Sequence, residues 1–415
     1  MSPRAGQRPV AIVVHAYYDE DARIRRHAEA LAAAGREVDV FALRRPGDAP
    51  QGRQGAISVH RLPVGRHQGA GLPVYLGEYL AFAGMAMVAL TREHARRHYA
   101  VAHVATIPDF LVFATLPLRM VGVPVILDLH EAMPEFFSSR FPAASGRLPN
   151  ALLRLQERSS IRYASAALTV NDALRDRLIG LGVPADKVTV TLNTPSLAMF
   201  DPTTVPSRAF AEDGRVRLVY VGALTPTYEI DVLVRAMDEL ARLRPDLQTE
   251  LDVYGRGDSS EPIAALVAEL GLGDRVRLHG RIPLEDVPTV VAAADIGIAP
   301  TRRDAFTDIS LSTKVFEYGA MGRPVVASGL PTIGRYFPGG EVTVYTPGDP
   351  ASLARAVLGL VDDPIGRASS TAAMLERVHE LSWEHEAERY RALVRRLESS
   401  RSGGRAEHER GDRPS

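Results

Sequence analysis

A lysine and a glutamate at the start of one helix are the side chains best suited to binding an anionic ligand. They lie in the stretch DISLSTKVFEYGAMGRPVVAS, from Asp308 to Ser328, which predicts a loop, a helix, a turn and a short buried strand. Lys314 and Glu317 are three residues apart and therefore share one helix face. Because the helix dipole disfavours a cation in the first turn, a bound anion would stabilise Lys314 there. The alternative is a surface ion pair worth about 0.3 kcal/mol.

The rarity of lysine favours the anion site. Only positions 187 and 314 are lysine, although lysine and arginine together number 49. A compact ammonium suits a phosphate as a point charge, whereas a planar guanidinium needs a wider site. Lys187 has no obvious chemistry around it. For the helix itself, we expect Ser310 or Ser312 as the N-cap, Gly322 as the C-cap and Pro324 just beyond it.

A second candidate side chain is a histidine at the end of an apolar run. Pro124–Leu129 predicts a buried parallel strand, and His130 follows it directly. Ligands of open α/β sheets bind outside the carboxyl ends of the strands. This position favours a role in chemistry, although a single histidine is also common as a structural residue.

The elements that must position these residues alternate between strands and helices. In the first half, the predicted strands are at residues 10–14, 37–43, 101–106, 124–129, 166–170 and 188–192. Helical segments separate them, which predicts a doubly wound parallel sheet, and Gly47–Gly71 is expected to be irregular. The alternation begins again at Leu218 after Pro195–Asp213, which we interpret as an interdomain linker. The first loop, HAYYDEDAR, lacks the GxGxxG pattern of dinucleotide dehydrogenases.

Length and composition set further limits. A chain of 415 residues is long enough for two domains, and a formal net charge of −1 gives no signature of nucleic-acid binding. Because there is no cysteine, disulfides, thiolate catalysis and thiolate metal sites are excluded. The first apolar run is too short for a signal peptide, and no run of about 18 apolar residues occurs. We therefore expect a cytoplasmic protein without a membrane-spanning helix.

One long helical stretch has two interpretations. Tyr75–Tyr99 has an apolar centre, LAFAGMAMVAL, and a basic end, ARRHY. It predicts either a buried core helix or, from Leu80 to Tyr99, a surface that contacts anionic lipid. At the C-terminus, the polar stretch Ser399–Ser415 predicts a disordered tail.

A series of segments resembles the retaining glycosyltransferases of family four, in particular the subgroup with DLHE-like and STKVFEY-like blocks. In chain order they are DARIRRHAEALAAAGREVDV, ATIPDFLVFATLPLRMVGVPVILDLHEAMPEFF, VYVGALTPTYEIDVLVRAM, VYGRGD, VRLHGRIP, ADIGIAP and STKVFEYGAMGRPVVAS. The resemblance covers roughly Val10 to Leu397. It implies an α/β protein of the GT-B fold, with two Rossmann-like, doubly wound domains facing across a cleft.

The resemblance also implies a division of labour between the domains. Residues 1–200 would bind the acceptor, residues 201–380 would bind the nucleotide sugar, residues 381–398 would form a helix that crosses back to the first domain, and residues 399–415 would be the tail. His130 would lie against the transferred sugar, Lys314 would face the diphosphate and Glu317 would bind the ribose hydroxyls. The remaining donor positions are Gly222 beside the phosphates, Arg281 and Ile282 at the nucleobase, and Asp308, Ser312 and Thr313. The acceptor-side positions are Asp21, Arg23, Pro108, Asp109 and Glu131.

The sequence departs from the family pattern at the expected phosphate clamp. Ala223 and Glu229 stand where many members have arginine and lysine. Ile309 replaces the first of two glutamates eight residues apart, so that Asp308 is the nearest acid. Either Lys314, together with Arg302 or Arg303, stabilises the phosphates, or the enzyme is weakened. The resemblance to the subgroup favours an active enzyme.

The implied activity is transfer of a sugar from a nucleoside diphosphate sugar to a glycan, lipid-linked or small-molecule acceptor, with retention of the anomeric configuration. No DxD cluster stands at a strand end in the second half, so we expect no metal and no other cofactor. A GT-B sugar epimerase and a non-catalytic scaffold of a membrane glycan-assembly complex are the alternatives. The expected partners are donor and acceptor, with peripheral contact at the inner membrane face and no nucleic acid.

Overall fold

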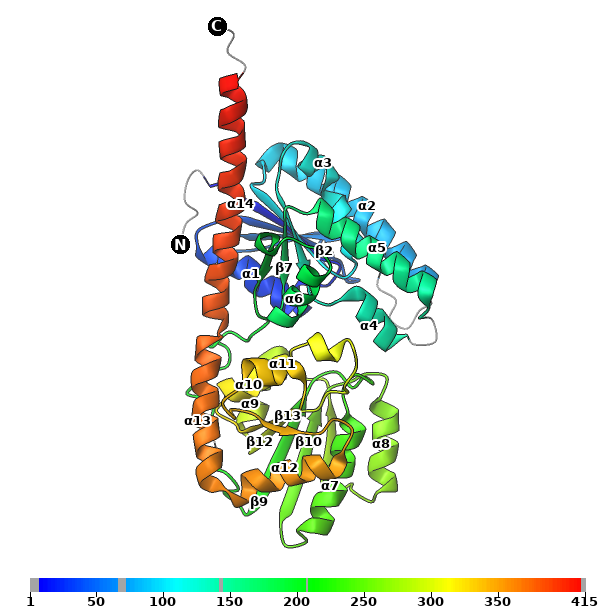
Figure 1. Ribbon diagram of the computed structural model, residues 1–415, viewed down its shortest axis with the longest axis vertical. Coiled ribbons are helices and arrows are strands. Elements are labelled where there is room, and N and C mark those ends of the chain that lie inside the picture. Colours follow the sequence, from blue (N-terminus) through cyan, green and yellow to red (C-terminus); the bar gives the residue numbers. More distant parts are fainter. Residues whose placement is uncertain (1–6, 66–71, 142–144, 207, 412–415) are drawn as a thin grey trace. The chain divides into compact units, whose positions relative to one another are not determined.

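The chain folds into two compact units, each built on one β-sheet. The computed structural model describes residues 7–65, 72–141, 145–206 and 208–411, with side chains as far as Ser400. Unit 1 comprises Met1–Leu192 and Glu386–Ser415, and unit 2 comprises Asn193–His385. In both units helices cover the two faces of the sheet (Figure 1). The prediction of two Rossmann-like α/β domains is confirmed.

The sheet of unit 1 has eight strands in the order β3-β4-β2-β1-β5-β6-β7-β8. All neighbouring pairs are parallel except β3 and β4. The strands are β1 (Val10–Val13), β2 (Val38–Leu43), β3 (Gln51–Gln54), β4 (Ile57–Leu62), β5 (Val101–Ala105), β6 (Val125–Leu129), β7 (Ala166–Thr169) and β8 (Val188–Val190). The expectation that Gly47–Gly71 is irregular is wrong for β3 and β4. In β4, buried Ile57 and Val59 alternate with half-buried Ser58 and His60, which is the period of a strand.

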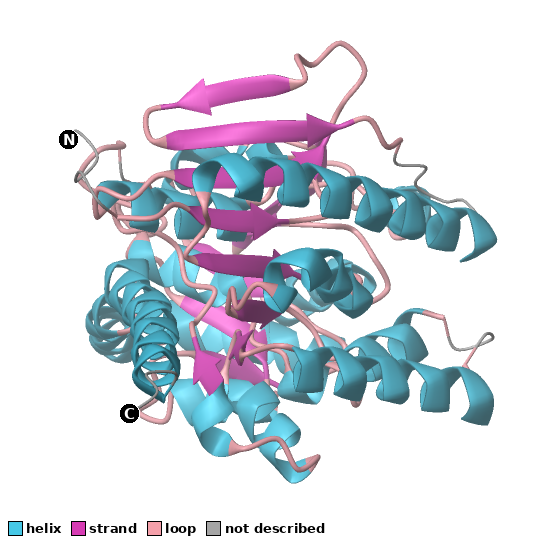
Figure 2. Cartoon of the chain, turned by 90° about the horizontal axis from the view of Figure 1, so that it is seen from above, coloured by secondary structure: helices cyan, strands magenta, loops and turns pink. Residues whose placement is uncertain are grey.

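The helices of unit 1 lie on both sides of this sheet (Figure 2). They are η1 (Tyr18–Glu20), α1 (Ala22–Ala33), α2 (Leu72–Arg97), η2 (Asp109–Thr115), α3 (Leu116–Met120), α4 (Met133–Arg140), α5 (Arg147–Tyr163), α6 (Asp172–Gly180), η4 (Ala185–Lys187) and most of α14 (Trp383–Gly411). Side chains of β1 alternate between two cores. Val10 and Ile12 pack with α1 and with Tyr390 of α14, whereas Ala11 and Val13 pack with α2 and η2. The helix α14 continues to Gly411, through most of the tail that the sequence predicts as irregular.

α2 is a surface helix and not the buried core helix of the first interpretation. Phe82, Ala86 and Leu90 pack into the core of unit 1, while Val88 on another side is 70% exposed. By length and composition alone, Pro73–Arg97 would suffice to cross a membrane, and 22% of its most apolar window is buried. The search for an uninterrupted apolar run missed this helix because Glu78 interrupts the run.

The sheet of unit 2 has six parallel strands in the order β11-β10-β9-β12-β13-β14. The strands are β9 (Arg215–Val221), β10 (Gln248–Tyr254), β11 (Val276–Gly280), β12 (Ile296–Ala299), β13 (Val325–Ser328) and β14 (Thr343–Tyr345). The helices are α7 (Ile230–Leu243), α8 (Ser260–Glu269), η5 (Leu284–Asp286), α9 (Val287–Ala292), η6 (Thr307–Ile309), α10 (Thr313–Ala320), α11 (Pro331–Tyr336), α12 (Pro350–Asp362) and α13 (Pro364–Glu380). One face of β9 and β10 packs with α7 and α12 through Leu218, Leu233, Leu251 and Val357.

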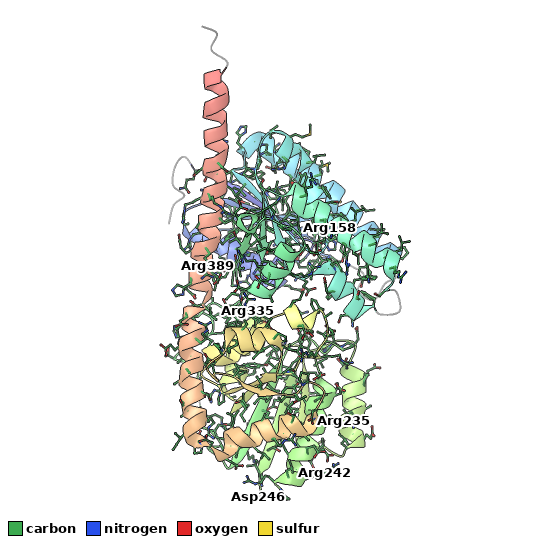
Figure 3. All side chains as sticks on the ribbon, viewed as in Figure 1. Arg158, Arg235, Arg242, Asp246, Arg335 and Arg389 are labelled. Carbon is green, nitrogen blue, oxygen red and sulfur yellow. The ribbon has the colours of Figure 1, made fainter. Side chains whose placement is uncertain are left out.

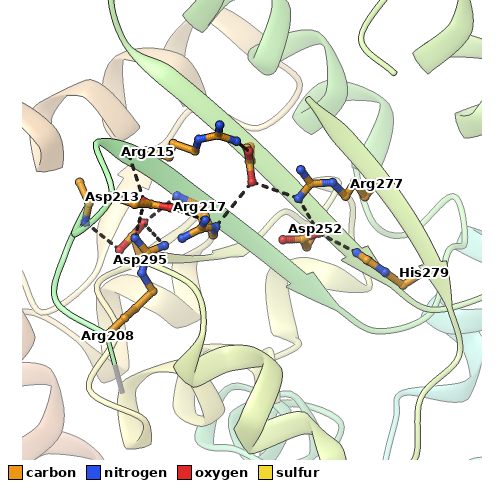
Figure 4. Close-up of polar contacts among 10 residues, drawn as sticks. Arg208, Asp213, Arg215, Arg217, Asp252, Arg277, His279 and Asp295 are labelled. Atoms are coloured by element: carbon orange, nitrogen blue, oxygen red, sulfur yellow. Dashed lines mark hydrogen bonds and ion pairs between the residues drawn. The ribbon is translucent and has the colours of Figure 1, made fainter. Parts of the chain in front are cut away.

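A ladder of ion pairs lies across β9, β10 and β11 (Figure 4). Glu250 of β10 contacts Arg217 of β9 at 3.5 Å and Arg277 of β11 at 3.0 Å. Next to this ladder, Asp295 is completely buried before β12. Its carboxylate accepts hydrogen bonds from the backbone N–H groups of Arg217 at 2.7 Å and Ala211 at 3.0 Å. This carboxylate therefore ties the segment before β9 to the middle of the sheet.

Replacing Asp295 by alanine should destabilise unit 2 because two largely buried amide groups lose their acceptor. We expect the free energy of unfolding to fall by about 2–4 kcal/mol, measured by urea unfolding of the full chain. Asp246→Ala is the matched control, because Asp246 is 70% exposed and pairs with Arg244 at the surface (Figure 3). Equal midpoints for Asp295→Ala and the control would contradict this account.

Candidate active site

The Lys314 ammonium lies between aromatic rings in unit 2. Lys314 is in the first turn of α10 and is only 7% exposed. Its Nζ lies 3.9 Å from the ring centroid of Tyr228 and 5.3 Å from that of Tyr220, within cation–π range. Among the described residues, no hydrogen bond or ion pair reaches this ammonium. The alternative of an exposed Lys314–Glu317 pair is therefore wrong.

Gly222, at the end of β9, leaves the space that the lysine side chain fills. Its φ of +154° lies in the region that favours glycine, and a Cβ there would overlap Lys314 Cε and stand 2.8 Å from Nζ. The backbone after β9 also packs directly against the backbone after β10, since a Cβ on Gly255 would overlap the Gly222 carbonyl. The Gly222 N–H also donates to the Tyr254 carbonyl at 2.9 Å. The predicted close approach of backbone at Gly222 is thus present, and the group it approaches is the Lys314 side chain.

Tight packing fixes α10 and therefore fixes Lys314. The Tyr318 hydroxyl accepts a hydrogen bond from the Val221 N–H at 2.9 Å, which ties the helix to the end of β9. Gly297 of β12 faces the Tyr318 ring, where no side chain would fit. On the other side, Gly319 packs against Met374 of α13. These contacts leave α10 little freedom to rotate about its axis.

The N-terminus of α10 has no side-chain cap. Ser312 takes the N-cap position without a side-chain hydrogen bond to the helix, and the Ser310 hydroxyl donates to the Phe306 carbonyl at 2.8 Å. The predicted hydroxyl cap is therefore wrong, while the C-terminal prediction is confirmed. Gly322 has φ +64°, and the N–H of Arg323 donates to the Tyr318 carbonyl as in a Schellman motif. Partly exposed Ser312 and Thr313 thus leave first-turn N–H groups for a ligand.

The positions that depart from the family pattern have partners of their own in unit 2. Burial raises the pKa of Glu229, whose carboxylate accepts from the Gly348 N–H at 2.8 Å. Asp308 pairs with Arg303 at 3.0 Å, and both side chains are partly exposed. Ala223 offers its carbonyl to the Tyr220 hydroxyl at 2.7 Å. Lys314 is consequently the buried cation at the start of α10.

In unit 1, a buried carboxylate organises the surroundings of His130. Asp128 of β6 accepts two hydrogen bonds from Arg23, at 2.8 and 3.0 Å, and one from His103 at 3.2 Å. His130 Nε2 lies 3.1 Å from the same carboxylate. Burial alone would raise the pKa of Asp128, but Arg23 and His130 outweigh it and hold the pKa well below its usual range. Asp128 is therefore ionised and can only accept.

This arrangement assigns the protons of both histidines. Because Asp128 accepts, Nε2 of His130 and Nε2 of His103 carry hydrogen. His103 Nδ1 then accepts from the Tyr390 hydroxyl of α14 at 2.8 Å, and burial lowers the pKa of His103. The His130 side chain is 20% exposed, and the bond from its Nε2 to Asp128 fixes the orientation of the ring.

A metal ion does not fit this cluster well. Nitrogen atoms of His27 and His103 and an oxygen of Asp128 lie within 4.8 Å of one another. Arg23, however, already binds both oxygens of Asp128, so a cation would have to displace a guanidinium. We interpret these residues as the support of His130.

Comparison with known proteins follows the same division into two units. Residues 21–194 match the family "Glycosyl transferase 4-like domain", and residues 215–363 match "Glycosyl transferases group 1". Each unit of the chain therefore carries a glycosyltransferase domain. It is 29% identical over 405 residues to a D-inositol 3-phosphate glycosyltransferase of Kineococcus radiotolerans, covering 91% of this chain and 90% of the relative.

Two solved structures share the fold of this glycosyltransferase. Sucrose-phosphate synthase from Thermosynechococcus elongatus superposes with a TM-score of 0.77 at 21% identity, covering 95% of this chain and all of that one. Anabaena Alr3699/HepE in complex with UDP-glucose gives a TM-score of 0.71 at 15% identity, covering 94% and 99% of the two chains.

Several residues that were predicted to bind the acceptor have a structural role or are buried in the glycosyltransferase. Arg23 is buried against Asp128, and Asp21 caps α1 by accepting from the Ile24 N–H at 3.0 Å. Pro108 and Asp109 are buried, so neither reaches the surface of unit 1. Burial also raises the pKa of half-buried Glu131. On the donor side, Arg281 is exposed and Ile282 half-buried just after β11, and their contact with a nucleobase stays a prediction.

Three residues that shape these sites were not predicted. Tyr220 and Tyr228 surround the ammonium, and no local spacing links them to Lys314. Asp128 had a usable signal, because it stands two residues before His130 and alternate strand residues face the same side.

Asp109 of the glycosyltransferase predicts a pH dependence of stability. Burial, followed by the charge of Glu157, raises its pKa to about 8, and no hydrogen bond within the described residues satisfies its carboxyl group. The folded state therefore holds a proton that the unfolded state loses above about pH 4. Stability due to this group should fall as pH rises from about 4 to 8, by at most about 1.4 kcal/mol per pH unit, and then level off.

The test compares urea unfolding of the full chain with that of Asp109→Asn between pH 5 and about pH 9. The asparagine variant should become progressively more stable relative to the parent up to about pH 8. Asp176→Asn, a change at an exposed carboxylate of α6, is the control. A constant difference between Asp109→Asn and the parent across this range would refute the assignment.

Proposed function

We propose that this enzyme takes a sugar from a nucleoside diphosphate sugar bound to unit 2 and transfers it to an acceptor hydroxyl with retention of the anomeric configuration. The observation that carries the proposal is the Lys314 ammonium, which is buried beside aromatic rings and has no carboxylate partner among the described residues. A buried charge without a counter-ion is costly, so an anion that enters this site is stabilised strongly. The complex of Alr3699/HepE with UDP-glucose supports a donor of this class.

In this reaction, unit 2 stabilises the leaving group, which is the nucleoside diphosphate. The bond between the anomeric carbon and the diphosphate oxygen breaks, and negative charge develops on that oxygen. Lys314 and the first-turn N–H groups of α10 lie at the same end of one helix. Donors that are fixed beside the atom on which charge develops lower such a barrier. We propose that they replace a metal ion in this role.

In unit 1, we propose that His130 positions and stabilises the transferred sugar. Its ring is held in place by the bond from Nε2 to Asp128. The acceptor oxygen bonds to the anomeric carbon on the face that the diphosphate leaves, and its proton passes to the leaving phosphate. No covalent intermediate on His130 is required. A cytoplasmic location and the identity of sugar, base and acceptor stay predictions.

Incubating the full chain with individual nucleotide sugars tests the reaction class. Release of the nucleoside diphosphate should require an acceptor, and NMR of the product should show the anomeric configuration of the donor. Conversion of the donor without an acceptor would identify an epimerase instead. Binding of donors without any turnover would identify a scaffold.

Lys314→Ala should lower kcat/KM by roughly ten- to a hundredfold. The reason is loss of a charge-assisted hydrogen bond to the leaving group, worth roughly 1.5–3 kcal/mol. Lys314→Arg should also impair the enzyme, because the guanidinium does not fit between Gly222 and the tyrosine rings. Glu317→Ala should act mainly on donor binding, since ribose contacts are equal in the ground and transition states.

Lys187→Ala is the matched control for Lys314. It removes the other lysine, whose Nζ donates to the Arg162 carbonyl at 3.3 Å in unit 1. Steady-state rates with saturating soluble acceptor distinguish the variants. If Lys314→Ala keeps activity within about twofold of the control, the role of the ammonium is structural.

His130→Ala should lower turnover far more than it lowers donor affinity. The donor makes its nucleotide contacts in unit 2, whereas His130 acts only on the transferred sugar. Donor affinity by calorimetry and kcat by product formation give the two quantities separately. His379→Ala, at an exposed position near the end of α13, is the control. Turnover of His130→Ala within about threefold of this control would assign His130 a structural role.

A further inference from the structure

The outer side of three helices in unit 1 exposes large apolar side chains. We call this surface the α2–α5 face. Its members are Val74, Leu76, Leu80 and Val88 of α2, Leu116, Met120 and Val121 at α3, and Leu148, Leu152 and Leu155 of α5. The most exposed are Met120 at 79%, and Val88 and Leu148 at 70% each. Extended apolar exposure on a folded domain marks an interaction site.

The three helices are neighbours on the same side of the sheet. η2 lies between α2 and α5, since Phe110 contacts Tyr79 of α2 and Phe113 contacts Tyr163 of α5 at ring-centroid distances of 6.5 and 5.0 Å. α3 continues directly from η2 and packs against α2. Both views show α2 and α5 on this side (Figures 1 and 2). The apolar side chains therefore belong to one face.

α5 adds positive charge to this face. Arg147, Arg154, Arg158 and Arg162 are exposed along the helix, between the exposed leucines. Arg158 is labelled in Figure 3. The single acid of α5, Glu157, is buried and pairs with Arg177 at 2.8 Å. The exposed side of α5 is thus apolar and basic, without a compensating carboxylate.

α2 and α3 show the same bias. From Pro73 to Thr91 the only charged residue of α2 is Glu78, which is 8% exposed. Arg92 and Arg96 are exposed near the end of α2, and Arg96 pairs with Glu93 at 3.3 Å. α3 carries exposed Arg119 and no acid. The whole chain has a formal net charge of −1, so the positive charge of the α2–α5 face is local.

We propose that the α2–α5 face docks on an anionic lipid bilayer. Leucine, valine and methionine side chains would enter the boundary between headgroups and acyl chains, while the arginines would bind lipid phosphates. A second copy of the chain is a poorer partner, because a twofold interface would bring the same uncompensated arginines together. The helices lie in the surface and do not span it, since Phe82, Ala86 and Leu90 pack into unit 1. The inference does not depend on the proposed reaction.

Flotation of the full chain with vesicles tests this proposal. Phosphatidylcholine vesicles containing phosphatidylglycerol should bind the chain at low salt at least about tenfold better than phosphatidylcholine alone, and high salt should release it. Arg154→Glu with Arg158→Glu should lower the bound fraction about tenfold, and Leu152→Ser with Leu155→Ser should also lower it. None of these residues belongs to the candidate active site.

Arg235→Glu with Arg242→Glu is the matched control, because both arginines are exposed on α7 of unit 2 (Figure 3). This control should bind vesicles like the parent. Circular dichroism and transfer to a soluble acceptor should be unchanged in all variants. The proposal is overturned by absence of binding at low salt, by an equal loss in the α7 control, or by a dimer in sedimentation that the α5 variants dissociate.

Discussion

A cation enclosed by aromatic rings governs the construction of unit 2. The cation–π interaction of the Lys314 ammonium with the rings of Tyr220 and Tyr228 is weaker than the hydration that the ammonium loses on burial. The arrangement is therefore maintained by the surrounding packing. Gly222 leaves space for the Lys314 side chain, the Tyr318 hydroxyl binds the end of β9, and Met374 of α13 packs against Gly319 of α10. Much of the packing around α10 thus holds a buried ammonium in place.

Unit 1 is organised around charge of the opposite sign. Asp128 binds groups from α1, β5 and the residue after β6, namely Arg23, His103 and His130. A carboxylate with this many donors stays ionised even when buried, which in turn fixes the protons on both imidazoles. The two units therefore use the same principle in different ways. In unit 1 the buried charge is paired with cationic and N–H donors, and in unit 2 the described residues surround it with aromatic rings.

The sequence allowed the fold and the two central residues to be predicted for physical reasons. Strand–helix alternation fixed the fold class, and position at a strand end or helix start singled out His130 and Lys314. The partners of these residues were not predictable in the same way, because Arg23 and Tyr228 reach them through tertiary packing. β3 and β4 were missed because the turn-rich composition of Gly47–Gly71 hid a short alternating pattern. The hydroxyl cap at Ser312 failed because propensity describes an average helix, and a helix that binds a ligand leaves its first N–H groups open.

The path of α14 has a consequence for how the protein is made. Trp383–His385 belong to unit 2, and from Glu386 onward the same helix belongs to unit 1, where Leu393 and Val394 complete the core and Tyr390 bonds to His103. A ribosome that has finished residue 192 has produced every strand of the unit 1 sheet but none of this helix. Unit 1 is therefore the first unit whose synthesis begins and the last that is complete. Its core can be completed only after all of unit 2 has been synthesised. A fragment that stops at Leu192 leaves the apolar side chains that α14 covers exposed to water, so unit 1 is incomplete when the chain is cut at this boundary.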